Sequence, residues 1–100
     1  MLKAKHISLD DDRLCCPVCG FSGGFHQSKY RISNPEDHGN KSVIVDATTL
    51  KGTDSTGFKL DDSRPREAIE IKFWCENCGA NELRLQIIQH KGSTHMKWGY

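Results

Sequence analysis

Four of the five cysteines occur in two turns of the pattern Cys-x-x-Cys-Gly, at residues 16–20 and 75–79. A two-residue spacer lets both sulfurs of a turn converge on one metal ion, and two such turns supply the four thiolates of a tetrahedral zinc site. A glycine after each pair can take a positive φ, which curls the chain around the sulfurs. The pattern predicts one structural Zn²⁺ ion, bound by Cys16, Cys19, Cys75 and Cys78.

Cys15 directly precedes the first turn and is the spare thiol of the run CCPVCG. If Cys15 paired with Cys19, the spacer would lengthen to three residues and the Cys-Pro-x-Cys-Gly frame would be lost. We therefore interpret Cys15 as a small buried apolar residue and not as a ligand.

Two other kinds of chemistry use the same residue types. Four thiolates from two turns also suit a single iron ion, as in rubredoxin-like electron-transfer proteins, and the sequence does not separate the two metals. The gap from Cys19 to Cys75 is much longer than the roughly 15 to 20 residues that separate the two cysteine pairs in the usual zinc pattern, which makes the match to that pattern less specific. A thiol–disulfide oxidoreductase requires a helix that starts at its first cysteine, and no helical pattern follows Cys19.

Composition and charge narrow the class of protein further. The chain has 100 residues and a formal net charge of +1, which by itself indicates neither a nucleic-acid nor a membrane partner. Leu, Ile, Val and Phe total 21 residues, so we expect a thin core that requires the bound metal for its stability. No apolar run is long enough for a signal peptide or a membrane span, and we expect a cytoplasmic protein.

Period-two patterns predict a mostly β fold, a small antiparallel sheet with two zinc knuckles and little or no helix, in one domain over residues 1–100. Ile69, Ile71 and Phe73 alternate with Glu70, Lys72 and Trp74, and the first set is predicted to face the core. We expect strands at 25–32, 42–49, 67–74, 83–88 and 94–98, a hairpin loop at 33–41 and a long mobile loop at about 51–66. In the first strand, one face is predicted to carry His26, Ser28, Tyr30 and Ile32.

The cysteine turns resemble those of the zinc ribbon superfamily. The segments CPVCG, IKFWCENCGA and IIQHKGSTHMKW, taken together, resemble small zinc-ribbon proteins encoded in bacterial, phage and prophage genomes. The resemblance covers residues 14–20 and 69–98, under half of the chain. It implies a β-rich domain with a structural zinc on the four turn cysteines, and it implies no activity.

Basic and aromatic residues of the last third are candidates for partner binding. If the alternation above holds, Lys72 and Trp74 share the face opposite the core, where an aromatic ring can stack a base and a cation can contact phosphate. The alternative is that Trp74 shields the zinc turn or packs beneath the long loop. The candidates are Lys72, Trp74, Arg84, His90, Lys91, Lys97 and Trp98.

Sequence signals for catalysis are absent. There is no P-loop, no G-x-G-x-x-G motif, no Ser-His-Asp order and no paired-carboxylate pattern, and the five histidines form no helical pair. We therefore expect a binding or adaptor module and not an enzyme, with no small-molecule substrate and no membrane. The basic and aromatic face favours nucleic acid as the partner, whereas the near-zero net charge favours a protein.

Overall fold

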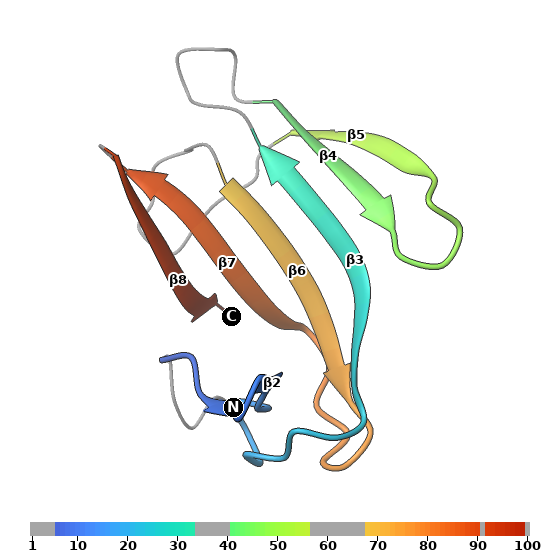
Figure 1. Ribbon diagram of the computed structural model, residues 1–100. Helices are drawn as coiled ribbons and strands as arrows, with labels where there is room; N and C mark the ends of the chain where they lie inside the picture. The colour runs from blue at the N-terminus through green and yellow to red at the C-terminus, as the bar shows by residue number, and fades with distance from the viewer. Residues whose placement is uncertain (1–5, 34–40, 57–67, 91, 100) are drawn as a thin grey trace.

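The computed structural model describes residues 6–33, 41–56, 68–90 and 92–99 (Figure 1). Within these residues the chain is built of strands and turns and contains no helix, which confirms the mostly β prediction. Consequently none of them forms a helix able to cross a membrane. The strands are β1 (Leu9–Asp10), β2 (Arg13–Leu14), β3 (Phe25–Ser33), β4 (Lys41–Asp46), β5 (Gly52–Thr56), β6 (Ala68–Cys75), β7 (Leu83–His90) and β8 (Ser93–Gly99).

Six of the strands form one antiparallel sheet in the order β5-β4-β3-β6-β7-β8, and β1 and β2 form a separate two-stranded ribbon. The six-stranded sheet consists of two three-stranded meanders that meet where β3 pairs with β6 (Figure 1). Because this pair is antiparallel, the start of β3 lies beside the end of β6, with Phe25 opposite Cys75. The topology therefore brings the two cysteine turns to the same end of the sheet.

A β-bulge at Ser28 corrects the predicted face of β3. His26 is paired with Trp74 and Gln27 with Phe73, but the register shifts so that Lys29, and not Ser28, is paired with Lys72. The extra residue reverses the alternation, since one inserted residue exchanges the two faces of a strand. His26 thus lies on the opposite face from Tyr30 and Ile32, and the prediction that they share one face was wrong.

Two further expectations are corrected at the β4–β5 hairpin. The strand predicted at 42–49 ends at Asp46, whose Oδ1 accepts hydrogen bonds from the backbone N–H groups of Thr48 and Thr49 and so closes a turn. The loop predicted at 51–66 contains β5, which is paired with β4 along residues 52–56. β5 is an edge strand, and its sequence GTDST has no apolar alternation that would have predicted a strand. Residues 57–66 of that predicted loop, and residues 34–40 of the predicted hairpin loop, lie outside the described residues.

One face of the sheet, here called the core face, carries an aromatic cluster at the metal end. The Phe25 and Phe73 rings stack at a centroid distance of 4.6 Å, and Trp98 packs edge-on against Phe73 at 5.7 Å. Leu83 and Leu85 are buried beside them. The N-terminal segment supplies the second layer, since the residues packed against this cluster include Ile7, Leu14 and Val18.

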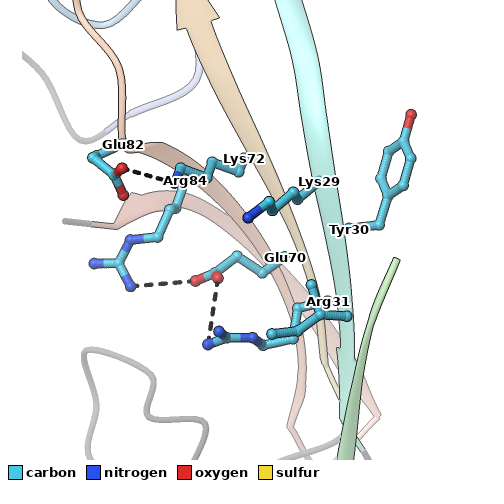
Figure 2. A pocket seen from close by; sticks show the side chains of 8 residues that line it. Lys29, Tyr30, Arg31, Glu70, Lys72, Glu82 and Arg84 are labelled. Carbon is cyan, nitrogen blue, oxygen red and sulfur yellow. Dashed lines mark hydrogen bonds and ion pairs between the residues drawn. The ribbon is translucent and has the colours of Figure 1, made fainter. Parts of the chain in front are cut away.

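The opposite face, here called the charged face, carries ionic side chains that β3, β6 and β7 contribute. Figure 2 shows Lys29, Arg31 and Glu70 on this side, while Tyr30 points away to the other side of β3. Glu70 is only 5% exposed, because it lies among the cations and accepts a hydrogen bond from the side-chain amide of Gln86 (3.0 Å). The predicted separation of Ile71 and Phe73 from Glu70 and Lys72 is confirmed by this register.

Candidate metal centre and charged sheet face

The first cysteine turn is closed by backbone hydrogen bonds. The N–H of Gly20 donates to the carbonyl of Cys16 (2.8 Å), and the N–H of Cys16 donates to the carbonyl of Phe21 (2.9 Å). Gly20 has a φ of 81°, a conformation that costs glycine little and other residues about 1–2 kcal/mol. The N–H of Val18, inside the turn, points at the Cys16 sulfur at 3.4 Å.

The second turn repeats the geometry of the first. Gly79 has a φ of 75° and its N–H donates to the carbonyl of Cys75 at 2.9 Å, while the N–H of Cys75 donates to Ala80 at 2.8 Å. The prediction of a positive φ at both glycines is therefore confirmed. Both turns hold their two sulfurs on one side of a small loop.

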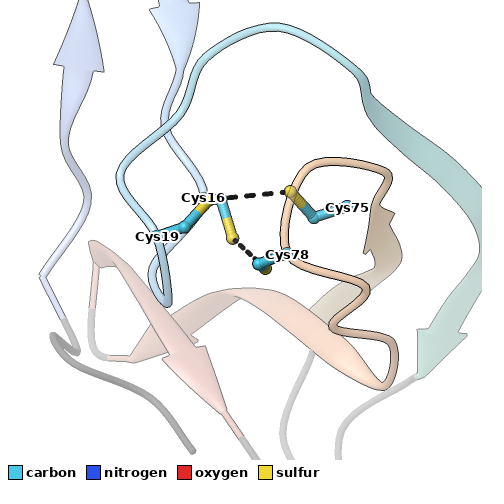
Figure 3. Close-up of side chains that lie close together, drawn as sticks. All are labelled: Cys16, Cys19, Cys75 and Cys78. Carbon is cyan, nitrogen blue, oxygen red and sulfur yellow. Dashed lines mark hydrogen bonds between the residues drawn. The ribbon is translucent and has the colours of Figure 1, made fainter.

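The four sulfurs of Cys16, Cys19, Cys75 and Cys78 converge at the end of the sheet (Figure 3). All four Sγ atoms lie within 4.8 Å of one another, and the Cys16–Cys78 and Cys19–Cys75 distances are both 3.8 Å. A tetrahedral zinc ion with Zn–S bonds of about 2.3 Å requires neighbouring sulfurs about 3.8 Å apart. The donor set and its spacing therefore fit one tetrahedral metal ion.

The thiols of the cluster lie in unequal surroundings. Cys16 and Cys75 are buried, and burial raises the pKa of the Cys16 thiol to about 12. Cys19 is exposed, and its sulfur accepts a hydrogen bond from the Asn77 side-chain amide at 3.3 Å. This hydrogen bond, followed by one from the backbone of Phe21, lowers the pKa of Cys19 to about 6. Burial favours the neutral thiol of Cys16, and because a metal ligand must be a thiolate, the charged form is favoured there only when a cation shares the site.

Cys15 lies outside the sulfur cluster, as predicted. Its backbone N–H donates to the carbonyl of Ser8 at 3.0 Å and so links the segment before β1 to the first turn. The Cys15 side chain is partly buried, short of the full burial that its interpretation as a core residue implied. The backbone hydrogen bond to Ser8 continues the β1–β2 pairing up to the first cysteine turn.

The structure brings together some of the candidate partner-binding residues. Lys72 and Arg84 are paired across β6 and β7, and Lys97 follows across β7 and β8 on the same face, opposite Gln86. Trp98 is 0% exposed and belongs to the aromatic cluster of the core face, so it offers no surface to a partner. The side chain of His90 and the whole of Lys91 lie outside the described residues.

An open pocket of about 410 Å³ lies on the charged face, between β3, β6 and β7 (Figure 2). Arg31 and Arg84 lie 3.9 and 3.5 Å from the two Glu70 oxygens. The Lys72 ammonium contacts Glu82 at 2.7 Å, and its hydrogen bond lowers the pKa of that carboxyl. Four cations face two carboxylates, namely Lys29, Arg31, Lys72 and Arg84 against Glu70 and Glu82.

Lys29 and Arg31 were missed in the sequence because their face depends on the bulge. Strict alternation from His26 places them with Gln27, on the core face. Only the register shift at Ser28 moves them beside Lys72. The available signal was the charge of the two residues, which makes a core position costly.

Trp74 stands at the metal end of the charged face and is 43% exposed. Its indole stacks on the His26 ring at a centroid distance of 4.5 Å, and His26 Nε2 lies 2.7 Å from a Glu76 oxygen. Glu76 belongs to the second cysteine turn. The expectation that Trp74 lies opposite the core is met, and the pair of rings is fixed to the turn through Glu76.

No protein-family model, curated protein or solved structure matches this chain. What the residues do is therefore argued from the site itself. Its two parts are a four-cysteine cluster with the spacing of a metal centre and a charged sheet face beside it.

Proposed function

We propose that this chain is a binding module whose fold is held by one structural zinc ion on Cys16, Cys19, Cys75 and Cys78, as in the zinc ribbons that its turns resemble. The observation that carries the proposal is the convergence of four sulfurs within 4.8 Å from two turns far apart in sequence. Four protein ligands complete a tetrahedral shell and leave no position for water or substrate. The metal is therefore assigned a structural role, and no catalytic step is assigned to the chain.

Iron in the same four-thiolate site is the competing assignment, since its coordination needs are met by the same ligands. Elemental analysis of the protein as purified tests the metal. We expect one zinc per chain and a colourless solution, because Zn²⁺ has a filled d shell. Stoichiometric iron with visible absorbance would contradict the zinc assignment and favour electron transfer.

Single-stranded nucleic acid is the partner that the charged face suits best. Lys29, Arg31, Lys72, Arg84 and Lys97 lie on one side of β3, β6, β7 and β8. A row of cations with an exposed aromatic beside it is typical of surfaces that track a phosphate backbone and stack bases. In this arrangement the lysines and arginines contact phosphates, and Trp74, braced by His26, stacks a base.

Glu70 and Glu82 have a positioning role in this proposal. Each carboxylate holds a cation of the same face by an ion pair: Glu70 holds Arg31 and Arg84, and Glu82 holds Lys72. Such pairs reduce the rotamer freedom of long side chains before a ligand arrives. The pocket keeps an excess of two positive charges, which favours an anionic ligand.

A titration with labelled single strands of DNA and RNA, and with duplex DNA, tests the partner. Affinity should fall as salt rises from about 25 to 200 mM, with a slope of the logarithm of the association constant against log salt of about −2 to −4 if several cations neutralise phosphates. Lys29→Glu should weaken binding, whereas the exposed Lys51, in the turn before β5, provides the matched control Lys51→Glu. No salt-sensitive binding to any of the three would exclude nucleic acid and leave a protein partner.

The stacking role of Trp74 is tested separately. Trp74→Ala should reduce affinity for a single strand by about tenfold, whereas Trp74→Phe keeps a ring and should lose much less. If both variants bind like the unmodified protein, Trp74 has no part in binding and its ring only packs on His26.

A further inference from the structure

A row of five apolar side chains crosses the core face at the end remote from the cysteines. The strand register places each member directly opposite the next, from β4 through β3, β6 and β7 to β8. This set, here called the apolar row, comprises Val43, Ile32, Ile69, Ile87 and Met96. Four members are between 39% and 53% exposed, and Ile87 is partly buried.

The apolar row is a continuation of the core face, and among the described residues no second layer packs on it. One row nearer the cysteines, Tyr30, Ile71 and Leu85 are direct cross-strand neighbours, and Ile71 and Leu85 already belong to the packed cluster. Scattered exposed apolar residues are common, but contiguous patches of several hundred Å² mark interfaces. An antiparallel sheet that is apolar on one face normally packs that face against another layer.

We infer that the apolar row is the contact surface of a homodimer, in which a second copy of this chain packs its own row against the first, sheet on sheet. The geometry is that of a β-sandwich, in which two antiparallel faces lie about 10 Å apart and cross at about 30°. A two-fold axis through the row makes the contact isologous, so each row meets its own copy.

Charge favours a second copy over a charged partner. None of the eight side chains of the apolar row and its inner neighbours Tyr30, Val45 and Ile71 is charged, and the net charge of the chain is only +1. Asp54 of edge strand β5 is paired with Val43 and flanks the row at this end, so two copies meet without like-charge repulsion along the row from β4 to β8 but not at that edge. Their charged faces remain outward, so the inference is independent of the nucleic-acid proposal.

The available area sets the strength of the contact. From β4 to β8 the row spans four strand spacings of about 4.8 Å, and together with the inner row and side-chain width the patch measures about 24 by 14 Å. A dimer would thus bury about 350 Å² per copy and about 700 Å² in total, which is below the size of stable interfaces and indicates a weak, transient contact. We expect a reversible dimer that forms in the range of about 10 µM to 1 mM.

Sedimentation equilibrium of the zinc-loaded full chain tests this inference. The apparent mass should rise from 11.3 kDa towards twice that value across the concentration range. Ile32→Lys should keep the chain monomeric, since it buries a charge within the contact. The control Leu50→Lys changes a side chain that is 73% exposed in the turn after β4, and it should dimerise normally.

Two further measurements locate the contact. On dilution, amide NMR signals of Ile69 and Met96 should shift while those of Lys72 and Arg84 stay in place. Raising salt to about 500 mM should not dissociate the dimer, because apolar contacts are not screened. If Ile32→Lys disturbs the amide spectrum of the monomer, Met96→Lys on edge strand β8 replaces it. A mass of 11.3 kDa at 1 mM, or a dimer that salt dissociates or that both lysine variants leave intact, would overturn the inference.

Discussion

The two ends of the core face carry similar apolar side chains and differ in what covers them. At the metal end, Phe73 and Trp98 are buried beneath the N-terminal segment, which the first cysteine turn ties to the sheet. At the remote end, Ile32 and Met96 are about half exposed. The comparison shows that strand register alone does not bury a residue. Burial here depends on a second layer, which the proposed metal ion on the four clustered cysteines would fasten to the sheet.

Removal of the metal should have the largest effect on this comparison. In the Trp74→Phe background, Trp98 is the only tryptophan, so its emission reports on the metal end alone. Chelation, or Cys75→Ser, should expose Trp98, shift its emission to the red and unfold most of the chain, because the binding free energy of a structural zinc is largely folding free energy. Cys15→Ser is the control and should retain both metal and emission, since Cys15 lies outside the cluster. A metal-free protein with native emission would refute the fastening role.

Truncation of one side chain at each end of the core face should lower the free energy of unfolding by different amounts. Trp98→Ala should lower the free energy of unfolding of the zinc-loaded chain by about 3–5 kcal/mol, because it empties a fully buried site. Ile69→Ala removes a side chain that is 41% exposed and should cost about 1 kcal/mol or less. Urea unfolding at about 5 µM, below the range of dimer formation, measures both values. Equal losses would mean that the remote end is packed as tightly as the metal end.

Glu70 extends the comparison to the opposite face. Glu70→Ala should destabilise the chain by about 1–3 kcal/mol, because it leaves the Gln86 side-chain amide unpaired in a buried position and removes the partner of Arg84. The Gln86 oxygen already lacks a hydrogen-bond partner. Glu82 also forms an ion pair on this face, but its side chain is 71% exposed, so Glu82→Ala should change stability by less than about 0.5 kcal/mol. The same urea measurement compares the two, and similar losses would show that burial of Glu70 has no energetic weight.

Asp46 at the β4–β5 hairpin gives the smallest expected effect. Hydrogen bonds from the backbone of Thr49 and then Thr48 lower the pKa of its carboxyl. A carboxyl whose pKa is lower in the folded state stabilises the fold above its unfolded pKa of about 3.9, and that contribution is lost as the pH falls through the folded value. NMR titration of the Asp46 carboxyl should give a pKa below about 3.9. Asp46→Asn should remove this part of the acid dependence of unfolding, and an unshifted pKa would show that the turn does not depend on the carboxylate.

The four clustered cysteines and most strands were predictable because their signals are local. A Cys-x-x-Cys-Gly turn specifies its own backbone, and the alternation of Ile69, Ile71 and Phe73 identifies β6 without knowledge of its neighbours. β5 was missed because a Ser- and Thr-rich edge strand has no apolar period. Its strand state comes from hydrogen bonds to β4, which lie outside the segment itself.

The sequence by itself determined which four cysteines cluster, the β class and the separation of apolar from charged positions in β6, because each follows from residue spacing within one turn or one strand. Only the tertiary structure decided that Trp98 belongs to the core, that Lys29 and Arg31 join Lys72, and that the apolar row has no second layer among the described residues. Each of these outcomes depends on pairing between distant segments or on a one-residue bulge, and a single inserted residue is enough to exchange the faces of a strand.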